Sequence, residues 1–259
     1  MKFRFCMLVC FFCAMVFVGL GAPTQAQDKS KSKIVSSFSP EQRKEVQEMI
    51  GSYLRANPEI ILESVRAMQQ REQDQEKQQG LQNLVAYREL ILNDPTSPVG
   101  GNPKGDVTVV EFFDYNCGYC KRVFPTLKKL MAEDKNLRVV FKEFPILSPQ
   151  SELAARAALA AWRQDKTKYM EIHSLFIELK GGFTESRILR LATKMGLDIK
   201  QLKIDMRSST MNKVINGNRQ LAQQLGISGT PGFIIGNRIV PGAVDLATLK
   251  ALIAEARKG

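Results

Sequence analysis

Two cysteines separated by two residues, Cys117 and Cys120, are the side chains of this sequence best suited to chemistry. They follow a β-forming run at residues 107–113 and open a segment that is expected to be helical. The first turn of a helix has unpaired backbone N–H groups and a positive dipole end, so a thiolate at Cys117 should be stabilised. Cys120 lies one turn further along, where it can close a disulfide with Cys117. The spacing predicts thiol–disulfide exchange, with Cys117 attacking and Cys120 resolving the mixed disulfide.

Other roles for a cysteine pair are weaker interpretations of the same residues. A structural zinc site needs four ligands. Once residues 1–26 are removed, the chain offers only the two thiols and one histidine, His173. A purely structural disulfide would close a very short loop, which yields little chain-entropy stabilisation. A dithiol that binds Cu(I) through soft sulfur ligands stays open as an alternative. We expect no metal site and no cofactor for the redox function.

Two features outside the cysteine motif point to the same site. Glu111 is the only charged residue of its apolar run and precedes Cys117 by six positions. It could face solvent, or it could be a buried carboxyl beneath the cysteines that assists proton transfer. Thr230-Pro231, between two glycines, precedes another β-forming run, where a proline is sterically allowed and a cis bond is plausible.

The first 26 residues predict a secretory signal that is cleaved. Lys2 and Arg4 precede an apolar run at residues 5–20, and Thr24-Gln25-Ala26 offers a cleavage site. The alternative, a membrane anchor, is disfavoured because the run is shorter than the roughly 20 residues that span a bilayer. Removal of the signal leaves only Cys117 and Cys120 as cysteines. We therefore expect an exported, periplasmic protein.

The composition indicates an ordinary globular chain. Its 259 residues are 44% apolar and 24% charged, which excludes a mainly disordered protein. The net charge of +11 is compatible with nucleic acid as a partner, but no basic-aromatic motif supports this, so we expect no nucleic-acid role.

The N-terminal part after the signal is expected to be helical. Ser39-Pro40-Glu41-Gln42 is a helix start with a capping box, and Asn57-Pro58 starts a second helix. Apolar residues recur at helical spacing in residues 46–54 and 61–68, whereas residues 69–79 are almost entirely polar. This polar stretch is interpreted as a solvated helix or stiff linker that ends at Gly80. We expect an oligomerisation region with its linker at residues 27–80 and a catalytic domain at residues 81–259.

The order of elements in residues 81–259 predicts an α/β fold. The expected sequence is a helix at 81–92, an irregular lead-in at 97–103, a strand at 107–113, a helix at 117–131, a strand at 137–144, a helical block within about 149–225, strands at 233–235 and 238–240, and a helix at 245–257. The helical block is large enough to be an insertion in the α/β core.

Together these motifs resemble the DsbA-like family of thioredoxin-fold proteins. The resemblance lies in Glu111-Phe112-Phe113 before Cys117-Gly118-Tyr119-Cys120 and in Thr230-Pro231 near the end. It implies a thioredoxin core with a helical insertion, and a cis-proline, Pro231, that faces the cysteines and receives the substrate chain. Tyr119, Thr230 and Pro231 are the expected substrate-binding residues. Residues 39–68 further resemble the N-terminal region of ScsC-type copper-sensitivity proteins, which forms trimers in some members and leaves others monomeric.

Details of the motif resemble the disulfide isomerases of the DsbC type. Gly118-Tyr119 lies between the cysteines and Thr230 precedes the proline, where DsbA-type oxidases typically have Pro-His and Val. The resemblance implies an isomerase or reductase of protein disulfides, with a DsbA-type oxidase and a Cu(I)-handling dithiol as alternatives. The implied partners are misfolded or reduced secreted proteins and a membrane redox partner that resets the pair. The N-terminal apolar faces favour a homo-oligomer, with a trimer preferred, over packing on the chain's own catalytic domain.

Overall fold

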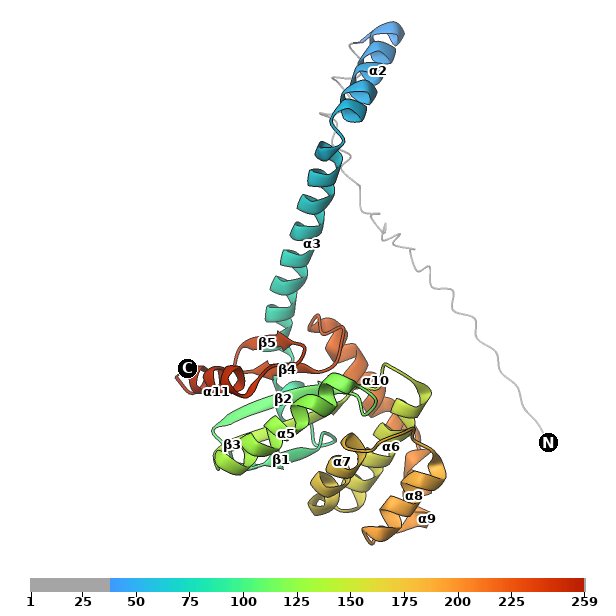
Figure 1. Ribbon diagram of the computed structural model, residues 1–259, viewed down its shortest axis with the longest axis vertical. Coiled ribbons are helices and arrows are strands. Elements are labelled where there is room, and N and C mark those ends of the chain that lie inside the picture. The colour runs from blue at the N-terminus through green and yellow to red at the C-terminus, as the bar shows by residue number, and fades with distance from the viewer. Residues whose placement is uncertain (1–37, 259) are drawn as a thin grey trace, which may run out of the picture. The chain divides into compact units, whose positions relative to one another are not determined.

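The computed structural model describes residues 38–258, so the expected signal at residues 1–26 lies outside the described part (Figure 1). Its contacts divide the chain into two units that meet between Arg66 and Ala67. Within the described residues, no helix is both long and apolar enough to cross a membrane.

Helix α2 (Pro40–Ala56) begins where the sequence predicts. The backbone N–H of Gln42 donates to Ser39 Oγ at 3.2 Å, and the Gln42 side chain accepts from the Ser39 backbone N–H at 2.9 Å. These reciprocal bonds satisfy donors that a helix start otherwise leaves unpaired. The predicted capping box is thus confirmed.

Helix α3 (Glu59–Ala86) corrects the prediction that the polar helix ends at Gly80. The helix continues through Gly80, and the break occurs at Tyr87, before the short helix α4 (Arg88–Leu92). Gly80 is buried, and a Cβ atom there would lie 3.0 Å from the Leu225 carbonyl oxygen. Gly80 therefore allows the helix to pack closely against the backbone at Leu225, and it does not end the helix.

A five-stranded sheet forms the centre of the second unit. Its order is β1-β3-β2-β4-β5, with β1 (Val99–Gly101), β2 (Val107–Phe113), β3 (Leu137–Glu143), β4 (Gly232–Ile235) and β5 (Arg238–Pro241). Strands β2 and β3 are parallel, and every other neighbouring pair is antiparallel. The α/β class is confirmed. The segment that forms β1 was expected to be irregular, which is wrong. Its three residues include two glycines and have no strand pattern of their own, so pairing with β3 orders them.

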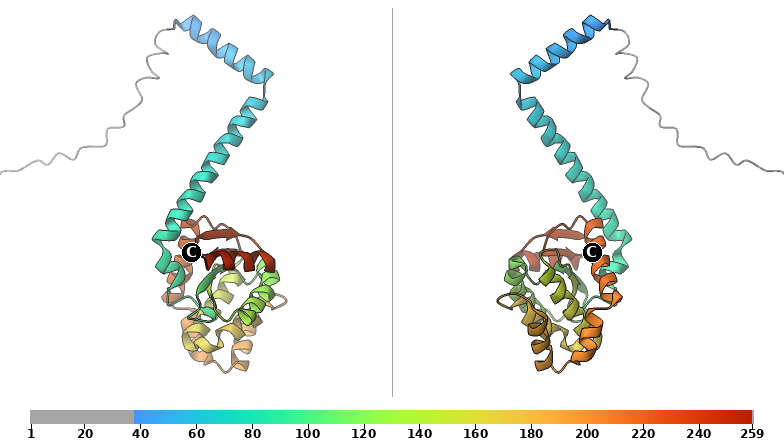
Figure 2. Two further views of the ribbon diagram at one scale, coloured as in Figure 1. Left: turned by 90° about the vertical axis from the view of Figure 1, so that its left-hand side faces the viewer. Right: turned by 90° about the vertical axis from the view of Figure 1, so that its right-hand side faces the viewer.

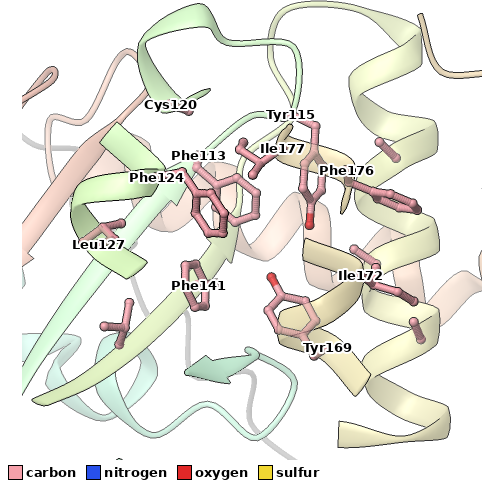
Figure 3. Packing of buried hydrophobic residues seen from close by; sticks show 14 of the residues in the cluster. Phe113, Tyr115, Cys120, Phe124, Leu127, Phe141, Tyr169, Ile172, Phe176 and Ile177 are labelled. Carbon is pink, nitrogen blue, oxygen red and sulfur yellow. The ribbon is translucent and has the colours of Figure 1, made fainter. Parts of the chain in front are cut away.

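Helices cover both faces of the sheet. Helices α5 (Gly118–Glu133) and α11 (Leu246–Ala256) pack with the larger apolar cluster, which includes Phe113, Phe124, Leu127 and Phe141 (Figure 3). The second cluster lies on the other side and comes from the ends of α3 and α4, from α10 (Ser209–Gln224), and from alternate positions of the same strands. Because successive strand residues face opposite sides, one run such as 107–113 supplies both clusters.

The helical insertion connects β3 to β4 (Figure 1). It consists of α6 (Pro149–Gln164), a short 3₁₀ turn (Lys166–Lys168), α7 (Tyr169–Ile177), α8 (Glu185–Lys194), α9 (Ile199–Met206) and α10. Helix α6 is buried through a row of alanines, which lets neighbouring helices approach its backbone closely. The insertion also brings the end of α10 back to the sheet, immediately before β4.

An ion pair buried beneath the sheet fixes the segment after α4. The Lys142 side chain is 1% exposed, and its Nζ donates to the Leu90 carbonyl oxygen at 2.8 Å and to Asp94 Oδ2 at 3.0 Å. A lysine in a central strand is costly unless its charge is paired. This pair therefore holds the chain that leads into β1 against β3.

Removal of the carboxylate from this pair should destabilise the fold. The Asp94→Ala variant leaves the Lys142 ammonium buried without its counter-charge, and we expect the free energy of unfolding to fall by about 3 kcal/mol. Urea denaturation monitored by circular dichroism measures the change. The double variant Asp94→Ala/Lys142→Met should recover most of the loss, and the control Asp106→Ala, which removes an exposed carboxylate, should have a smaller effect. Equal losses for the two single variants would contradict the argument.

Candidate functional site

Cys117 is the N-cap residue of α5 and lies directly after the loop that leaves β2. Its Sγ accepts a hydrogen bond from the Cys120 backbone N–H at 3.4 Å, and Cys120 closes the first turn of the helix. The hydrogen bond from the Cys120 thiol makes the largest contribution to lowering the pKa of Cys117 to about 5, and backbone N–H groups of the turn add to it. Cys117 is therefore a thiolate at neutral pH, as a nucleophile in disulfide exchange must be.

Cys120 has the opposite character. It is 1% exposed, and its pKa lies well above the ordinary value for a thiol. The main cause is its hydrogen bond to the Cys117 sulfur, followed by burial and by the nearby charge of Glu111. Both cysteines are free thiols in the structure. The pair thus consists of one ionised sulfur and one sulfur that retains its proton.

Glu111 lies in the middle of β2, paired with Phe141 on one side and Phe233 on the other. The side chain is buried, with the residue 2% exposed, so the alternative that it faces solvent is wrong. Burial, and then the negative charge of Cys117, raise the pKa of this carboxyl to about 8. At neutral pH it carries a proton for most of the time and can exchange it near that pH.

The segment before β4 completes the site from the far end of the chain. The Thr230–Pro231 peptide bond is cis, and the Thr230 carbonyl oxygen lies 3.2 Å from Cys117 Sγ. The Pro231 carbonyl oxygen accepts from the backbone N–H of Gly242 at 2.8 Å, which ties the segment to the end of β5. The structure therefore brings Cys117, Cys120 and the Thr230-Pro231 segment together, with Glu111 buried nearby.

Tyr119 differs from the other predicted site residues because it lies on the surface. It is 57% exposed, and the Arg122 guanidinium lies 4.2 Å from the centre of its ring. This cation–π contact orients the ring without burying it. Tyr119 is thus available to a partner that approaches the start of α5.

The loop between β2 and Cys117 is held by a residue that the sequence analysis did not identify. Asp114 is buried, and its carboxylate accepts from the backbone N–H groups of Asn116 at 2.8 Å, Ile146 at 2.9 Å and Leu147 at 3.0 Å. Its backbone carbonyl accepts from the Cys117 N–H at 3.0 Å. Asp114 thus positions the nucleophile by linking two loops. The signal was an aspartate immediately after an apolar strand, a position that favours side-chain-to-backbone bonds.

A buried polar cluster on the same face of the sheet was also missed. It consists of Glu143, Tyr115, Tyr169 and His173, and Figure 3 shows the hydroxyl groups of the two tyrosines pointing toward one another. Tyr115 Oη lies 3.0 Å from His173 Nδ1, and burial lowers the pKa of His173 to about 3. Burial raises the pKa of Glu143 well above its ordinary value. His173 is therefore uncharged at neutral pH, and burial favours the protonated form of Glu143.

The histidine of this cluster is not part of a metal site. Among residues 38–258, no group of three or more His, Cys, Asp or Glu side chains is arranged to hold a metal ion. Glu143 could have been noticed in the sequence, because Lys142-Glu143 interrupts an apolar strand in the same way that Glu111 does.

Comparison with known proteins gives two family matches that together cover most of the described chain. Residues 108–254 match the DSBA-like thioredoxin domain, and residues 42–75 match the Copper resistance protein ScsC N-terminal domain. Both regions are the ones whose motifs carry the resemblance. The resemblance to these two families is confirmed.

Solved structures agree with these matches. A thioredoxin-like oxidoreductase from Silicibacter pomeroyi is 45% identical, with 66% of this chain and 98% of that chain covered and a TM-score of 0.63. ScsC from Proteus mirabilis, in a transitional conformation, is 31% identical, with 85% and 99% covered and a TM-score of 0.64. The thioredoxin fold with a helical insertion and N-terminal helices is confirmed.

Curated relatives include longer proteins. The Na⁺/H⁺ antiporter NhaA 1 of Salinispora arenicola is 28% identical over 163 residues, which are 62% of this chain and 25% of the antiporter. The chain thus spans about a quarter of the length of such relatives. Disulfide bond formation protein D of Bacillus subtilis is 27% identical over 173 residues, with 62% of this chain and 78% of that protein covered.

The ionisation of Cys117 can be measured by its rate of alkylation. Because only the thiolate reacts, the rate of iodoacetamide labelling should rise with pH through a midpoint near pH 5. In the Cys120→Ala variant the largest stabilising contact is lost, and the midpoint should move upward by roughly one pH unit or more. Mass spectrometry of the reduced protein identifies the labelled cysteine. A midpoint above pH 8 in the wild type, or no shift in the variant, would contradict the assignment.

Proposed function

Because the chain belongs to the DSBA-like thioredoxin domain family, we propose that it is a periplasmic thiol–disulfide oxidoreductase that acts on protein disulfides as an isomerase. The observation that carries the proposal is the unequal pair of thiols at the start of α5. Cys117 is ionised, while the buried Cys120 retains its proton. An isomerase needs this state, because it must begin as a reduced enzyme that attacks a wrong disulfide.

The first step is attack by the Cys117 thiolate on one sulfur of a substrate disulfide. A bond forms between Cys117 and that sulfur, and the second substrate sulfur leaves as a thiolate. In isomerisation, this or another substrate thiolate attacks elsewhere in the substrate until a substrate thiolate displaces Cys117, which returns as the thiolate. The numbers of disulfides and thiols in enzyme and substrate are unchanged.

Alternatively, Cys120 resolves the mixed disulfide. It loses its proton and attacks the Cys117 sulfur, a Cys117–Cys120 disulfide forms, and the substrate sulfur leaves as a thiolate. The substrate gains two electrons and the enzyme loses two. The chain without residues 1–26 has no third cysteine, so a separate redox protein of the membrane must return the pair to the dithiol state.

Glu111 is suited to accept the proton of Cys120 during this step. Its pKa of about 8 is raised in part by the negative charge on Cys117, and a mixed disulfide removes that charge. The same event removes the contact that contributes most to the high pKa of Cys120. Formation of the mixed disulfide therefore makes Cys120 easier to deprotonate, and it lowers the pKa of Glu111, so that more of this carboxyl is ionised at neutral pH and able to accept the proton.

The residues around the pair favour an isomerase over an oxidase. No histidine lies between the cysteines, and Thr230 precedes the cis-proline, as in DsbC-type isomerases. Loss of that histidine removes one group that stabilises the thiolate, which makes the disulfide less oxidising. Thr230, Pro231 and the exposed Tyr119 are the proposed contacts for the substrate chain.

The oligomerisation region expected within residues 27–80 is proposed to build a trimer through α2 and the first half of α3. Large apolar side chains are exposed there, including Met49 at 68%, Tyr53 at 58% and Leu62 at 57%. They recur at the spacing of one helix face, and solvent-exposed apolar rows of this kind commonly mark interfaces. The match of residues 42–75 to an ScsC N-terminal domain supports the same assignment.

Isomerase action is tested with residues 27–259 and scrambled ribonuclease A in a mildly reducing glutathione buffer. We expect ribonuclease activity to recover faster than in buffer alone, and the Cys117→Ser variant to give no such gain because the attacking sulfur is absent. The same proteins are then given reduced ribonuclease. Rapid oxidation of that substrate without recovery of the scrambled one would replace the isomerase by an oxidase. Stoichiometric Cu(I) binding without any exchange would replace both by a copper-handling dithiol.

The trimer is tested by multi-angle light scattering on the same chain. The wild type should have three times the mass of one chain, and Ile50→Glu should yield monomers because it places a charge in the apolar row. Ser52→Glu adds the same charge on the polar face of α2, which also holds Glu48 and Arg55, and should leave the mass unchanged. A monomeric wild type, or a variant Ile50→Glu that keeps the wild-type mass, would refute the proposal.

A further inference from the structure

A groove lies beside the cis-proline segment, within the unit that begins at Ala67. It encloses about 590 Å³. One wall is the second half of α3, represented by Gln73, Glu76, Lys77 and Leu81. The opposite wall and the floor come from residues 225–231 and from Ile239, Pro241 and Gly242 at β5. The second half of α3, which the sequence predicts to be a solvated helix or stiff linker, thus forms part of a concave surface.

The α3 wall is fixed to the segment that carries the cis-proline. Gly80 is buried against the Leu225 carbonyl oxygen, and Asn83 Nδ2 donates to the Gln224 carbonyl oxygen at 2.6 Å. Leu84 is 3% exposed in the apolar cluster that also contains Leu225 and Ile227. In Figure 2 the lower end of α3 accordingly lies beside α10. The groove is therefore a built feature of this unit.

The groove shares one residue, Thr230, with the surroundings of the reacting sulfur. Thr230 lines the groove, and the Thr230 carbonyl oxygen lies 3.2 Å from Cys117 Sγ. Ser228 and Gly229, which precede Thr230 in the lining, are exposed, and their backbone N–H groups form no hydrogen bond to any residue within 38–258. A polypeptide that is joined to Cys117 by a disulfide and extends toward the groove would therefore meet unpaired backbone donors beside Thr230.

We propose that the groove binds the extended polypeptide segment next to the reacting cysteine of a substrate protein, and that α3 contacts this segment as one wall. The inference rests on the proposed exchange function and adds a substrate-binding role for the linker helix. Leu81, Ile239 and Pro241 offer apolar surface. Gln73, Glu76 and Lys77 offer an amide and charges of both signs at the rim.

This chemistry fits an unfolded polypeptide with mixed apolar and polar side chains. The amide of Gln73 has both a donor and an acceptor, which matches the exposed backbone of an extended chain. The two opposite charges of Glu76 and Lys77 tolerate substrates of either charge. Selection of an extended backbone rather than one sequence is what a catalyst that repairs many misfolded proteins requires.

The experiment compares two glutamines of the same helix. Gln73 lines the groove, whereas Gln78 is equally exposed and lies on the opposite face of α3, outside the groove. For each variant, Gln73→Trp and Gln78→Trp, the rate of exchange with scrambled ribonuclease A is divided by the rate with bis(2-hydroxyethyl) disulfide. We expect Gln73→Trp to lower this ratio about five-fold, because the indole fills the groove, and Gln78→Trp to leave it at the wild-type value.

A second measurement tests contact directly. Benzoylphenylalanine replaces Gln73 or Gln78 in the Cys120→Ser background, which traps the mixed disulfide with scrambled ribonuclease A. After illumination and reduction, a crosslink should remain from position 73 and be absent from position 78, and it should vanish when Cys117→Ser is added.

The outcomes separate the two proposals. A wild type that exchanges with neither disulfide would refute the proposed function. A wild type that exchanges with both, together with equal ratios and equal crosslinking for positions 73 and 78, would refute the groove inference alone.

Discussion

The hydrogen bond between the Cys120 thiol and the Cys117 sulfur is the interaction on which the chemistry of this protein depends. It is the largest cause of both the low pKa of Cys117 and the high pKa of Cys120. Helix α5 creates it, because Cys117 caps the helix and Cys120 lies in its first turn. The pair therefore consists of a nucleophilic thiolate at Cys117 and a thiol at Cys120 that retains its proton. Once Cys117 is bonded to a substrate, the interaction is lost and the proton is released, so the order of the two attacks follows from the structure itself.

The surroundings of the pair are shaped by carboxyl groups removed from water. Glu111 and Glu143 lie on adjacent strands and face the same side of the sheet as the cysteines, while Asp114 ends β2 and binds backbone N–H groups of two loops. Burial of Glu111 and Glu143 changes their pKa, whereas the buried Asp114 forms hydrogen bonds to the backbone. Burial raises the pKa of Glu111 and of Glu143 and so favours their protonated forms, whereas Asp114 fixes the path of the chain. The thioredoxin fold thus supplies rigid strands that set the distance of each group from Cys117.

Local patterns predicted the parts of this structure that local energies decide. The capping box at Ser39, the helix that starts after Cys117 and the apolar strand at residues 107–113 are all encoded within a few neighbouring residues. Strand β1, the continuous helix through Gly80 and the loop role of Asp114 were missed because each depends on a distant partner: β3, Leu225 and residues 146–147 respectively. The cis-proline could be placed only by family resemblance, and the cluster around Glu143 only by three-dimensional structure. The chemistry of a short motif such as Cys117–Cys120 can be predicted from sequence. The distant residues that hold the motif in place cannot.

The insertion of α6–α10 between β3 and β4 separates two parts of the site by 113 residues, from Cys117 to Thr230. The first turn of α5 makes the largest contribution to the low pKa of Cys117, whereas Thr230 in the segment before β4 adds to it and belongs to the proposed substrate surface. As the chain leaves the ribosome, Cys117 therefore emerges long before Thr230, and the domain must fold across the whole insertion before the two residues meet. The complete site is thus a property of the folded domain, because neither the first turn of α5 nor the segment before β4 forms it alone.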